Sequence, residues 1–295
     1  MSTPLDIHIL PIDPPGGNKS ASPALLTAYP PRRASRVRRN DRILIAIHFQ
    51  GTAKFPEAQQ HQMLEKLSEG YFKSRGTVTS AMCDMAVSVN DLLWNRNKRS
   101  SAHGQTVTAA LSLMVFRENY IYMMQSTPAS VQHFAQGRAD TYRERNLSMH
   151  GLGSTQVPKL QFFQAQLEPG DVLIYALNKP DLWTEDHLGS LFGKPIRKAY
   201  QLMAQGLTAD PGGMLISVRT GLGEINLIQE KPAVKPAPSQ TATRPPETSR
   251  PGYVPPFVMD DMPDLEKEPD EAEMLERAVQ PEAIDEETVI EEPTD

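Results

Sequence analysis

The chain has 295 residues, enough for one large domain or two small ones, and only 39% of them are hydrophobic, which is low for a chain packed throughout. Its single cysteine, Cys83, excludes an intrachain disulfide and a cysteine-rich zinc site. The net charge of −6 hides an asymmetry, because Asp260–Asp295 holds 16 acidic against 2 basic residues, a charge of −14 that leaves +8 on residues 1–259.

The sequence carries no membrane signal. Its first residues lack a basic start followed by an apolar segment, and no stretch approaches the roughly 18 apolar residues of a membrane-spanning helix. We therefore expect a cytoplasmic protein that does not contact a membrane.

Residues 1–40 are rich in proline and then in arginine, which predicts a flexible arm. Six arginines fall close together: Arg32, Arg33, Arg36, Arg38, Arg39 and Arg42. Such a cluster is able to hold phosphates, but it has no interleaved aromatic residues and no motif that reads nucleic acid. We expect a solvated arm, or one that contacts the acidic tail of the same chain, and nucleic acid is the less favoured partner.

Residues 41–222 are expected to form the folded domain. Apolar, β-branched runs indicate buried strands, and two stretches with helical spacing of apolar residues follow the first strand. The predicted elements are a strand at 43–49, helices at 56–74 and 78–95, strands at 106–116, 119–126, 129–135, 158–167 and 172–177, a helical region to about 205, and a strand at 212–220. We read the middle strands as an antiparallel meander of about five. Separate runs of strands and helices predict an α+β layered domain.

Residues 223–295 are expected to be disordered. Of the 26 prolines in the chain, 12 follow Glu230, and the acidic run comes after most of them. Proline and like charges favour extended, solvated backbone over a packed core.

The segment Gln166–Leu177 joins a tight turn to an apolar strand. Pro169-Gly170-Asp171 has the composition of a turn, and the Asp171 carboxylate is expected to bond the local backbone. With two further segments, Gly104–Leu111 and Gly151-Leu152-Gly153, this turn and strand resemble, in the same order, the metal-dependent protein phosphatase family of the protein phosphatase 2C type, over about residues 41–220.

That resemblance implies a β-sandwich flanked by helices on both sides. It also implies a site in which aspartates and a glycine carbonyl hold two divalent cations, Mg²⁺ or Mn²⁺, that activate a water against phosphoserine or phosphothreonine. The family's aspartate positions fall on four residues of this chain: His48, Pro128, Asn178 and Gly212. None is acidic, and hard cations require oxygen ligands, preferably charged.

We therefore expect no metal, no cofactor and no catalytic residue at these positions. A small shift of register would place Asp181 at one of them, but a single carboxylate does not hold two metals. His48 lacks a second histidine or carboxylate at metal-ligand spacing. Lys179 brings a positive charge to the site, and we expect it, together with Arg32 and Arg33, to contact an anion or phosphate.

The function expected from these residues is that of a pseudophosphatase, a catalytically degenerate phosphatase-like domain that acts in binding or regulation of signalling. Its expected partner is a protein, phosphorylated or acidic. Two alternatives stay open: an active metal-dependent serine/threonine phosphatase with an atypical site that uses Mn²⁺ or Mg²⁺, and a nucleic-acid-binding protein that uses the N-terminal arginines.

Overall fold

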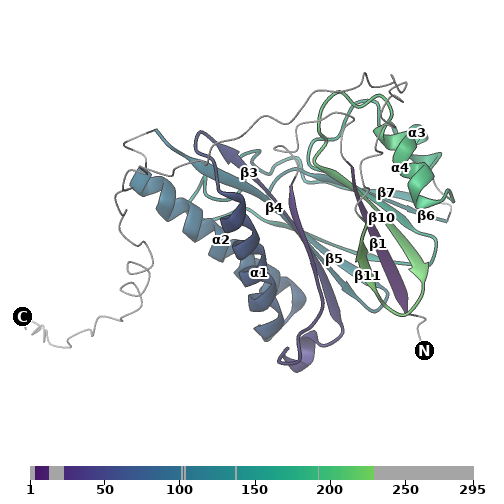
Figure 1. Cartoon of the computed structure of the whole chain (residues 1–295), viewed down its shortest axis with the longest axis horizontal. Helices are drawn as coiled ribbons and strands as arrows, with labels where there is room; N and C mark the ends of the chain where they lie inside the picture. Colours follow the sequence, from purple (N-terminus) through teal and green to yellow (C-terminus); the bar gives the residue numbers. More distant parts are fainter. Residues whose placement is uncertain are drawn as a thin grey trace, which may run out of the picture. The chain divides into compact units, whose positions relative to one another are not determined.

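Two β-sheets lie face to face in the computed structural model, which describes residues 4–12, 23–100, 102, 104–136, 138–191 and 193–228 (Figure 1). The chain divides into two units, Met1–Ala233 and Val234–Asp295, of which the second lies wholly outside the described residues. Most of the tail predicted at 223–295 therefore lies outside them as well.

One sheet, here called the β3 sheet, has the strand order β2-β3-β4-β5-β8, and every neighbouring pair is antiparallel. Its strands are β2 (Ala24–Ala28), β3 (Asp41–Gly51), β4 (Val107–Arg117), β5 (Tyr120–Gln125) and β8 (Gln161–Gln166). The longest pairing joins β3 to β4, from Asp41 opposite Arg117 to Gly51 opposite Val107.

The other sheet, here called the β9 sheet, has the order β11-β1-β10-β9-β6-β7. Its strands are β1 (Leu5–Ile12), β6 (Ser130–Ala135), β7 (Arg138–Tyr142), β9 (Val172–Ala176), β10 (Gly213–Thr220) and β11 (Ile225–Leu227). Only β1 and β11 pair in parallel; the other described pairs of this sheet are antiparallel.

Helices cover the outer face of each sheet (Figure 1). The helices α1 (Glu57–Lys73) and α2 (Val78–Ser100) pack on the β3 sheet, and α3 (Glu185–Gly189) and α4 (Ile196–Ala204) pack on the β9 sheet. No helix in the described part of the chain is long and apolar enough to cross a membrane. The order of layers is helix, sheet, sheet, helix, and the α+β prediction is confirmed.

Burial on both faces explains why the strands read as continuous apolar runs. In β3, Ile45 packs toward α1 and α2, whereas its neighbour Leu44 packs into the core between the two sheets. In β9, Leu173 faces that inner core and Ile174 faces the core under α3 and α4. A strand covered on both sides has no solvent face, so it lacks the polar alternation of a half-exposed strand.

The prediction of a flexible arm at residues 1–40 is wrong for two segments, which form strands. Leu5–Ile12 forms β1 inside the β9 sheet, with Ile7 and Ile9 fully buried, and Ala24–Ala28 forms β2. Pro11 fits because β1 pairs with β11 only at residues 7–9, so its missing N–H leaves no gap in that ladder. The folded domain therefore starts before residue 41 and, through β11, continues beyond residue 222.

The prediction of a single antiparallel meander of about five strands is also wrong, because these strands belong to two sheets. β4 and β5 pair as expected, but β6 belongs to the opposite sheet, and β8 takes the place beside β5. The segment between β6 and β8, for which no strand was predicted, contains the edge strand β7. The short connection from β5 to β6 thus crosses between the sheets and carries Pro128 to the end of the sandwich.

Candidate functional site

Three of the four family-matched positions meet around Ala176, the last residue of β9. Ala176 pairs with Gly213 on one side and with Ser130 on the other, so the chain just before β10, just before β6 and just after β9 comes together. The Leu177 amide donates to the Gly212 carbonyl over 3.4 Å, and the Asn178 amide donates to the Pro211 carbonyl over 2.9 Å. These strand ends bring Pro128, Asn178 and Gly212 into one neighbourhood.

His48 reaches the same region from the β3 sheet. It lies near the end of β3, opposite Ala110 of β4. Burial lowers the pKa of His48, and the negative charge of Asp210, in the loop before β10, partly opposes that effect. The Asp210 Oδ1 atom accepts a hydrogen bond of 2.7 Å from the Gly212 amide, which fixes the loop.

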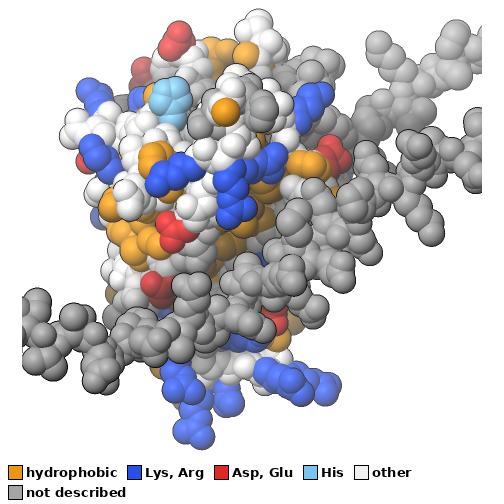
Figure 2. Space-filling view, turned by 90° about the vertical axis from the view of Figure 1, so that its left-hand side faces the viewer, with side chains coloured by type: hydrophobic (Ala, Val, Ile, Leu, Met, Phe, Trp, Pro, Cys, Tyr) orange, Lys and Arg blue, Asp and Glu red, His pale blue; other side chains and the backbone are white. Residues whose placement is uncertain are grey.

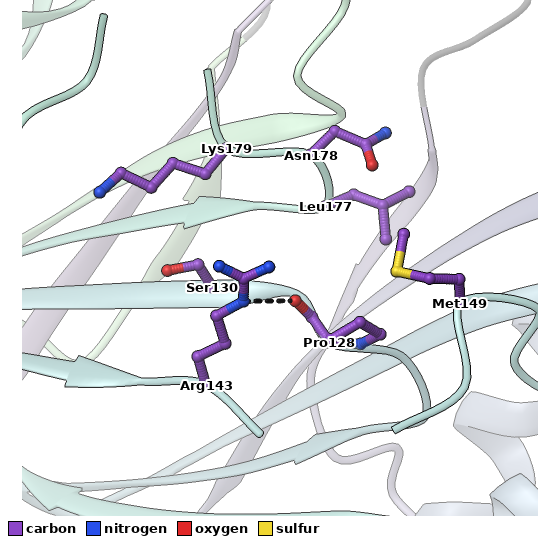
Figure 3. Close-up of a pocket in the computed structure, with 7 residues that line it drawn as sticks. All are labelled: Pro128, Ser130, Arg143, Met149, Leu177, Asn178 and Lys179. Atoms are coloured by element: carbon purple, nitrogen blue, oxygen red, sulfur yellow. Dashed lines mark hydrogen bonds between the residues drawn. The ribbon is translucent and has the colours of Figure 1, made fainter. Parts of the chain in front are cut away.

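A pocket of about 220 Å³ opens where these strand ends meet (Figure 3). Its walls come from the β5–β6 connection, the start of β6, the chain after β7 and the end of β9. The lining residues are Pro128, Ser130, Arg143, Met149, Leu177, Asn178 and Lys179. Two family-matched positions, Pro128 and Asn178, therefore share a pocket with the predicted anion contact Lys179.

The charge of this pocket is positive. Arg143 follows β7, and its Nε donates to the Pro128 carbonyl over 3.2 Å, which directs the guanidinium toward the segment that carries Asn178 and Lys179 (Figure 3). Among the described residues, no acidic side chain lines the pocket, and no carboxylate forms an ion pair with Arg143 or Lys179. Two cations thus lie at one small opening without a fixed counter-charge.

The residues present do not fit a pair of Mg²⁺ or Mn²⁺ ions. The matched positions supply one imidazole, one amide and backbone carbonyls, and the Pro128 and Gly212 carbonyls already accept hydrogen bonds. Among the residues that the structure describes, no group of three or more His, Cys, Asp or Glu side chains is placed to hold a metal. Hard divalent cations need several oxygen ligands to offset dehydration, and two nearby cationic side chains disfavour them further.

The alternative register at Asp181 does not rescue such a site. Asp181 is exposed and does not line the pocket, whereas Trp183, two residues later, is fully buried under α3 and α4. The Trp183 indole donates to the Met203 carbonyl over 3.2 Å. This anchor fixes the register after β9, with Asn178 and Lys179 at the pocket and Asp181 outside its lining.

The predicted contacts Arg32 and Arg33 lie elsewhere. They precede the short 3-10 turn η2 (Arg36–Arg38) and the start of β3, where Ser35 bonds the end of α1, whereas His48 lies seven residues further along that strand. At about 3.3 Å per residue, these seven residues of β3 span roughly 20 Å. Arg32 and Arg33 are not among the residues that line the pocket with Lys179, and the anion contacts predicted for all three stay predictions.

Two of the six clustered arginines are structural. Arg38 is fully buried and donates to the Gly76 and Thr77 carbonyls, and Arg42 donates to the Leu5 carbonyl over 2.6 Å. The exposed members are Arg32, Arg33, Arg36 and Arg39. Lys and Arg side chains gather at the lower end of the view in Figure 2, and the turn before β3 lies at the lower end of Figure 1.

Asp171 has the local role predicted for it and a second one. Its Oδ2 accepts from the Glu168 amide over 2.9 Å, which closes the turn. The same oxygen lies 2.8 Å from Nε2 of His133, and both side chains are buried. Their pairing across β9 and β6 depends on sheet order, and no local sequence signal identified it.

Comparison by sequence finds no matching family model and no matching curated protein. Solved structures do match. The S. agalactiae serine/threonine phosphatase aligns with a TM-score of 0.56 at 10% identity over 74% of this chain and 100% of that chain. Stp1 of Staphylococcus aureus aligns at 0.55 with 12% identity, covering 76% and 97%, and PppA of Pseudomonas aeruginosa at 0.50 with 13%, covering 75% and 99%.

The chain therefore has the fold of bacterial serine/threonine phosphatases of the protein phosphatase 2C type, as the resemblance predicted. At these identities the likeness concerns the fold alone. What the chain does depends on the residues at its strand ends.

Proposed function

We propose that this chain is a pseudophosphatase: a phosphatase-fold domain that binds a protein partner in cytoplasmic signalling and does not hydrolyse phosphoesters. The observation that supports this proposal is the cationic pocket that has Pro128 and Asn178 in its lining. Two-metal hydrolysis needs charged oxygen ligands that share a water. At this end of the sandwich the chain offers Arg143 and Lys179 instead.

Hydrolysis of a phosphothreonine peptide by the full chain tests this proposal. We expect no release of phosphate with or without millimolar Mn²⁺ or Mg²⁺, and no rise in melting temperature on adding either metal, because a ligand stabilises only a folded state that binds it. A catalytically active phosphatase of this fold, assayed beside it, confirms that the substrate and metal are competent. Metal-dependent turnover by this chain would refute the proposal.

The alternative of an active enzyme with an atypical site is favoured by one feature: burial lowers the pKa of His48, and the Asp210 carboxylate is near enough to oppose that effect. An imidazole and a carboxylate together suit a transition metal better than Mg²⁺. Under this alternative, Mn²⁺ raises the melting temperature of the chain, and both the rise and the turnover disappear in His48→Ala and in Asp210→Asn.

Nucleic-acid binding requires a different test from deletion of the N-terminal segment, because β1 and β2 belong to the fold. The four exposed arginines are replaced instead, as Arg32→Gln, Arg33→Gln, Arg36→Gln and Arg39→Gln in one variant. Unchanged retention of the variant on a nucleic-acid column would remove this alternative, since phosphate contacts dominate such binding.

A further inference from the structure

A second pocket, here called the Arg42 pocket, lies at the end of the sandwich away from the family-matched positions. Its walls come from the start of β1, the residues after β2, the start of β3, the β4–β5 turn and the residues after β10. The pairing of β1 with β10 places Leu5 opposite Thr220 at this end and Ile12 opposite Gly213 at the other end. The Arg42 pocket is therefore separate from the pocket that contains Lys179.

Arg42 is a buried cation in the wall of this pocket. The residue is only 8% exposed, and its Nη1 donates to the Leu5 carbonyl over 2.6 Å. Among the described residues, no carboxylate forms an ion pair with Arg42, and its Nε and Nη2 atoms have no hydrogen-bond partner, although neither atom is sealed from solvent. Because Arg42 lines the pocket, these two nitrogens are the donors that a ligand there meets.

The free edge of Arg42 has the geometry that binds a carboxylate. Nε–H and one Nη2–H of a guanidinium point in parallel and match the two oxygens of a carboxylate. Arg117 uses the same two nitrogens on Asp41, with Nε 2.6 Å from Oδ1 and Nη2 2.8 Å from Oδ2. The bond from Arg42 Nη1 to the Leu5 carbonyl orients the guanidinium in advance, so less side-chain entropy is lost when a carboxylate binds.

The carboxylates near Arg42 are engaged elsewhere. Asp41 lines the pocket, but its carboxylate is bound by Arg117. Asp6 does not line the pocket, and its Oδ1 accepts from two backbone amides of the turn after β10. Burial lowers the pKa of Arg42, and the charge of Asp6 opposes that effect without reversing it. The Arg42 guanidinium has thus lost water without gaining a full counter-charge.

The other charged side chains of the lining select a single negative charge. Arg39 and Glu118 both line the pocket, both are exposed, and their charges are of opposite sign. The charge left to attract a ligand is therefore that of Arg42. A carboxylate, with one negative charge, matches it better than a phosphate monoester, whose charge is near −2 at neutral pH.

Apolar walls accompany this charge. Pro30 and Leu222 line the pocket, and Leu222 is 86% exposed. The Tyr29 ring forms a further wall and is held in place, because its hydroxyl donates to the Ile225 carbonyl over 2.8 Å and accepts from the Ile225 amide over 2.6 Å. The volume of about 410 Å³ lies within the range of roughly 300–1,000 Å³ that is typical of small-molecule pockets.

We propose that the Arg42 pocket binds a small monocarboxylic acid with an apolar body. The carboxylate pairs with Nε and Nη2 of Arg42, and the body covers Tyr29 and Leu222. This inference goes beyond the proposed function and does not depend on it, because the two pockets lie at opposite ends of the sandwich. Since the walls come from both sheets, the bound acid stabilises the folded domain.

The experiment is isothermal titration of the full chain, with melting temperature as a second readout. Benzoate and octanoate probe an aromatic and an aliphatic body, benzamide and octanamide lack the charge, acetate lacks the body, and phenyl phosphate carries the larger charge. We expect benzoate or octanoate to raise the melting temperature. That acid should bind about tenfold or more tightly than acetate and its own amide, the difference typical of a charge-assisted hydrogen bond.

Three results would overturn the proposal. The first is that neither acid binds at millimolar concentration, which would leave Arg42 paired with water only. The second is an amide, or phenyl phosphate, that binds as tightly as the matching acid. The third is a five-residue peptide with a central glutamate and blocked ends that binds where both acids fail, because a protein segment would then be the ligand.

Variants locate the binding. Arg42→Lys keeps the charge and loses the parallel donors, and Leu222→Glu adds a negative charge to the rim at an exposed side chain. Each should weaken the bound acid by about tenfold or more. Circular dichroism checks that Arg42→Lys is folded, and Leu222→Glu decides the matter if it is not.

Matched controls come from exposed residues outside the pocket lining, as Arg36→Lys and Val157→Glu. Their affinity for the acid should stay within about twofold of the parent, because charge-assisted contacts act at close range. Equal losses in the controls would show that binding follows net charge and would refute a built site. Parental affinity in a folded Arg42→Lys and in Leu222→Glu would equally refute it.

Discussion

Asp41 and Arg117 form a two-pronged ion pair at the start of β3: Arg117 Nε lies 2.6 Å from Asp41 Oδ1, and Arg117 Nη2 lies 2.8 Å from Asp41 Oδ2. The Tyr71 hydroxyl donates to the same carboxylate over 2.7 Å, and the buried Arg38 lies 3.6 Å away. The Asp41 carboxylate thus joins β3, β4, α1 and the arginine-rich turn. It also compensates the charge of the Arg38 guanidinium, which has no access to water.

We expect Asp41→Asn to lower the free energy of unfolding by about 3–5 kcal/mol, because removing one partner leaves the buried Arg38 without a counter-charge. Urea unfolding followed by circular dichroism measures the change. Glu69→Gln is the matched control, since the Glu69–Lys73 pair is exposed, and its stability should not change measurably. An Asp41→Asn variant as stable as the parent would contradict this account of the cluster.

β1 provides a test of the corrected domain boundary. Ile9 is fully buried in the core between the sheets, so Ile9→Ala is expected to cost about 2–5 kcal/mol of unfolding free energy from lost burial and the cavity left behind. Val37→Ala, at a side chain that is 51% exposed, is the control and should change little. If the N-terminal segment were a flexible arm, both variants would behave alike.

Tyr175 makes stability depend on alkaline pH. Its hydroxyl bonds that of Ser112 over 2.9 Å between the two sheets, and burial raises the pKa of Tyr175 to about 12. An unfolded tyrosine ionises near pH 10, so the native state binds the proton more tightly. Stability from this group is complete below pH 10 and is lost, by roughly 3 kcal/mol in all, as the pH rises from 10 through 12.

Urea unfolding at several pH values from 9 to 12 measures this slope. Tyr175→Phe is expected to reduce it without abolishing it, because burial and the Asp41 carboxylate also raise the pKa of Tyr71. Tyr120→Phe, at a half-buried side chain, serves as the control and should keep the parental slope. An unchanged slope in Tyr175→Phe would show that this hydroxyl is not the titrating group.

His48 gives a second pH dependence, of opposite direction. Burial lowers the pKa of His48 from its usual value near 6.5, so the native state binds the proton less tightly than the unfolded chain. The contribution of His48 to the free energy of unfolding is complete above pH 6.5 and is lost as the pH falls through the lowered pKa. NMR titration of the ring protons measures that pKa directly.

Asp210→Asn is expected to lower the pKa of His48 further, because the Asp210 charge is the influence that opposes burial. Asp181→Asn removes a carboxylate that is exposed and absent from the pocket lining, and the titration of His48 should not move. If Asp210→Asn left the pKa of His48 unchanged, the two residues would not interact. That result would count against the alternative of an active phosphatase with an atypical site.

Local sequence patterns predicted the elements in which buried side chains recur at regular intervals along the chain. The runs after Ile43 and Val172 gave buried strands, and the spacing of Leu64, Leu67 and Tyr71 gave α1. The Pro-Gly-Asp turn fixed the start of β9, and with it the position of Asn178 and Lys179 after the strand. These features depend on neighbours a few residues apart, which a single sequence displays.

Tertiary structure decided what depends on distant pairing. Leu5–Ile12 is a strand because β10 and β11, over 200 residues later, supply its hydrogen-bond partners, and the surrounding prolines concealed it. Arg143 comes from a connection with no apolar pattern, yet the β6–β7 hairpin delivers it to the pocket that contains Lys179. Distant contacts also decide which of the six clustered arginines are buried. Arg38 and Arg42 are buried, and the other four are exposed.

The sequence by itself therefore determined most of the apolar segments of residues 41–222 that form the layers, and that no acidic residue stands at the four matched strand ends. Only the tertiary structure decided which strands are neighbours and which cations share a pocket. The physical reason is that burial periodicity is encoded within one element, whereas sheet order and charge clustering arise from contacts between elements far apart in the chain.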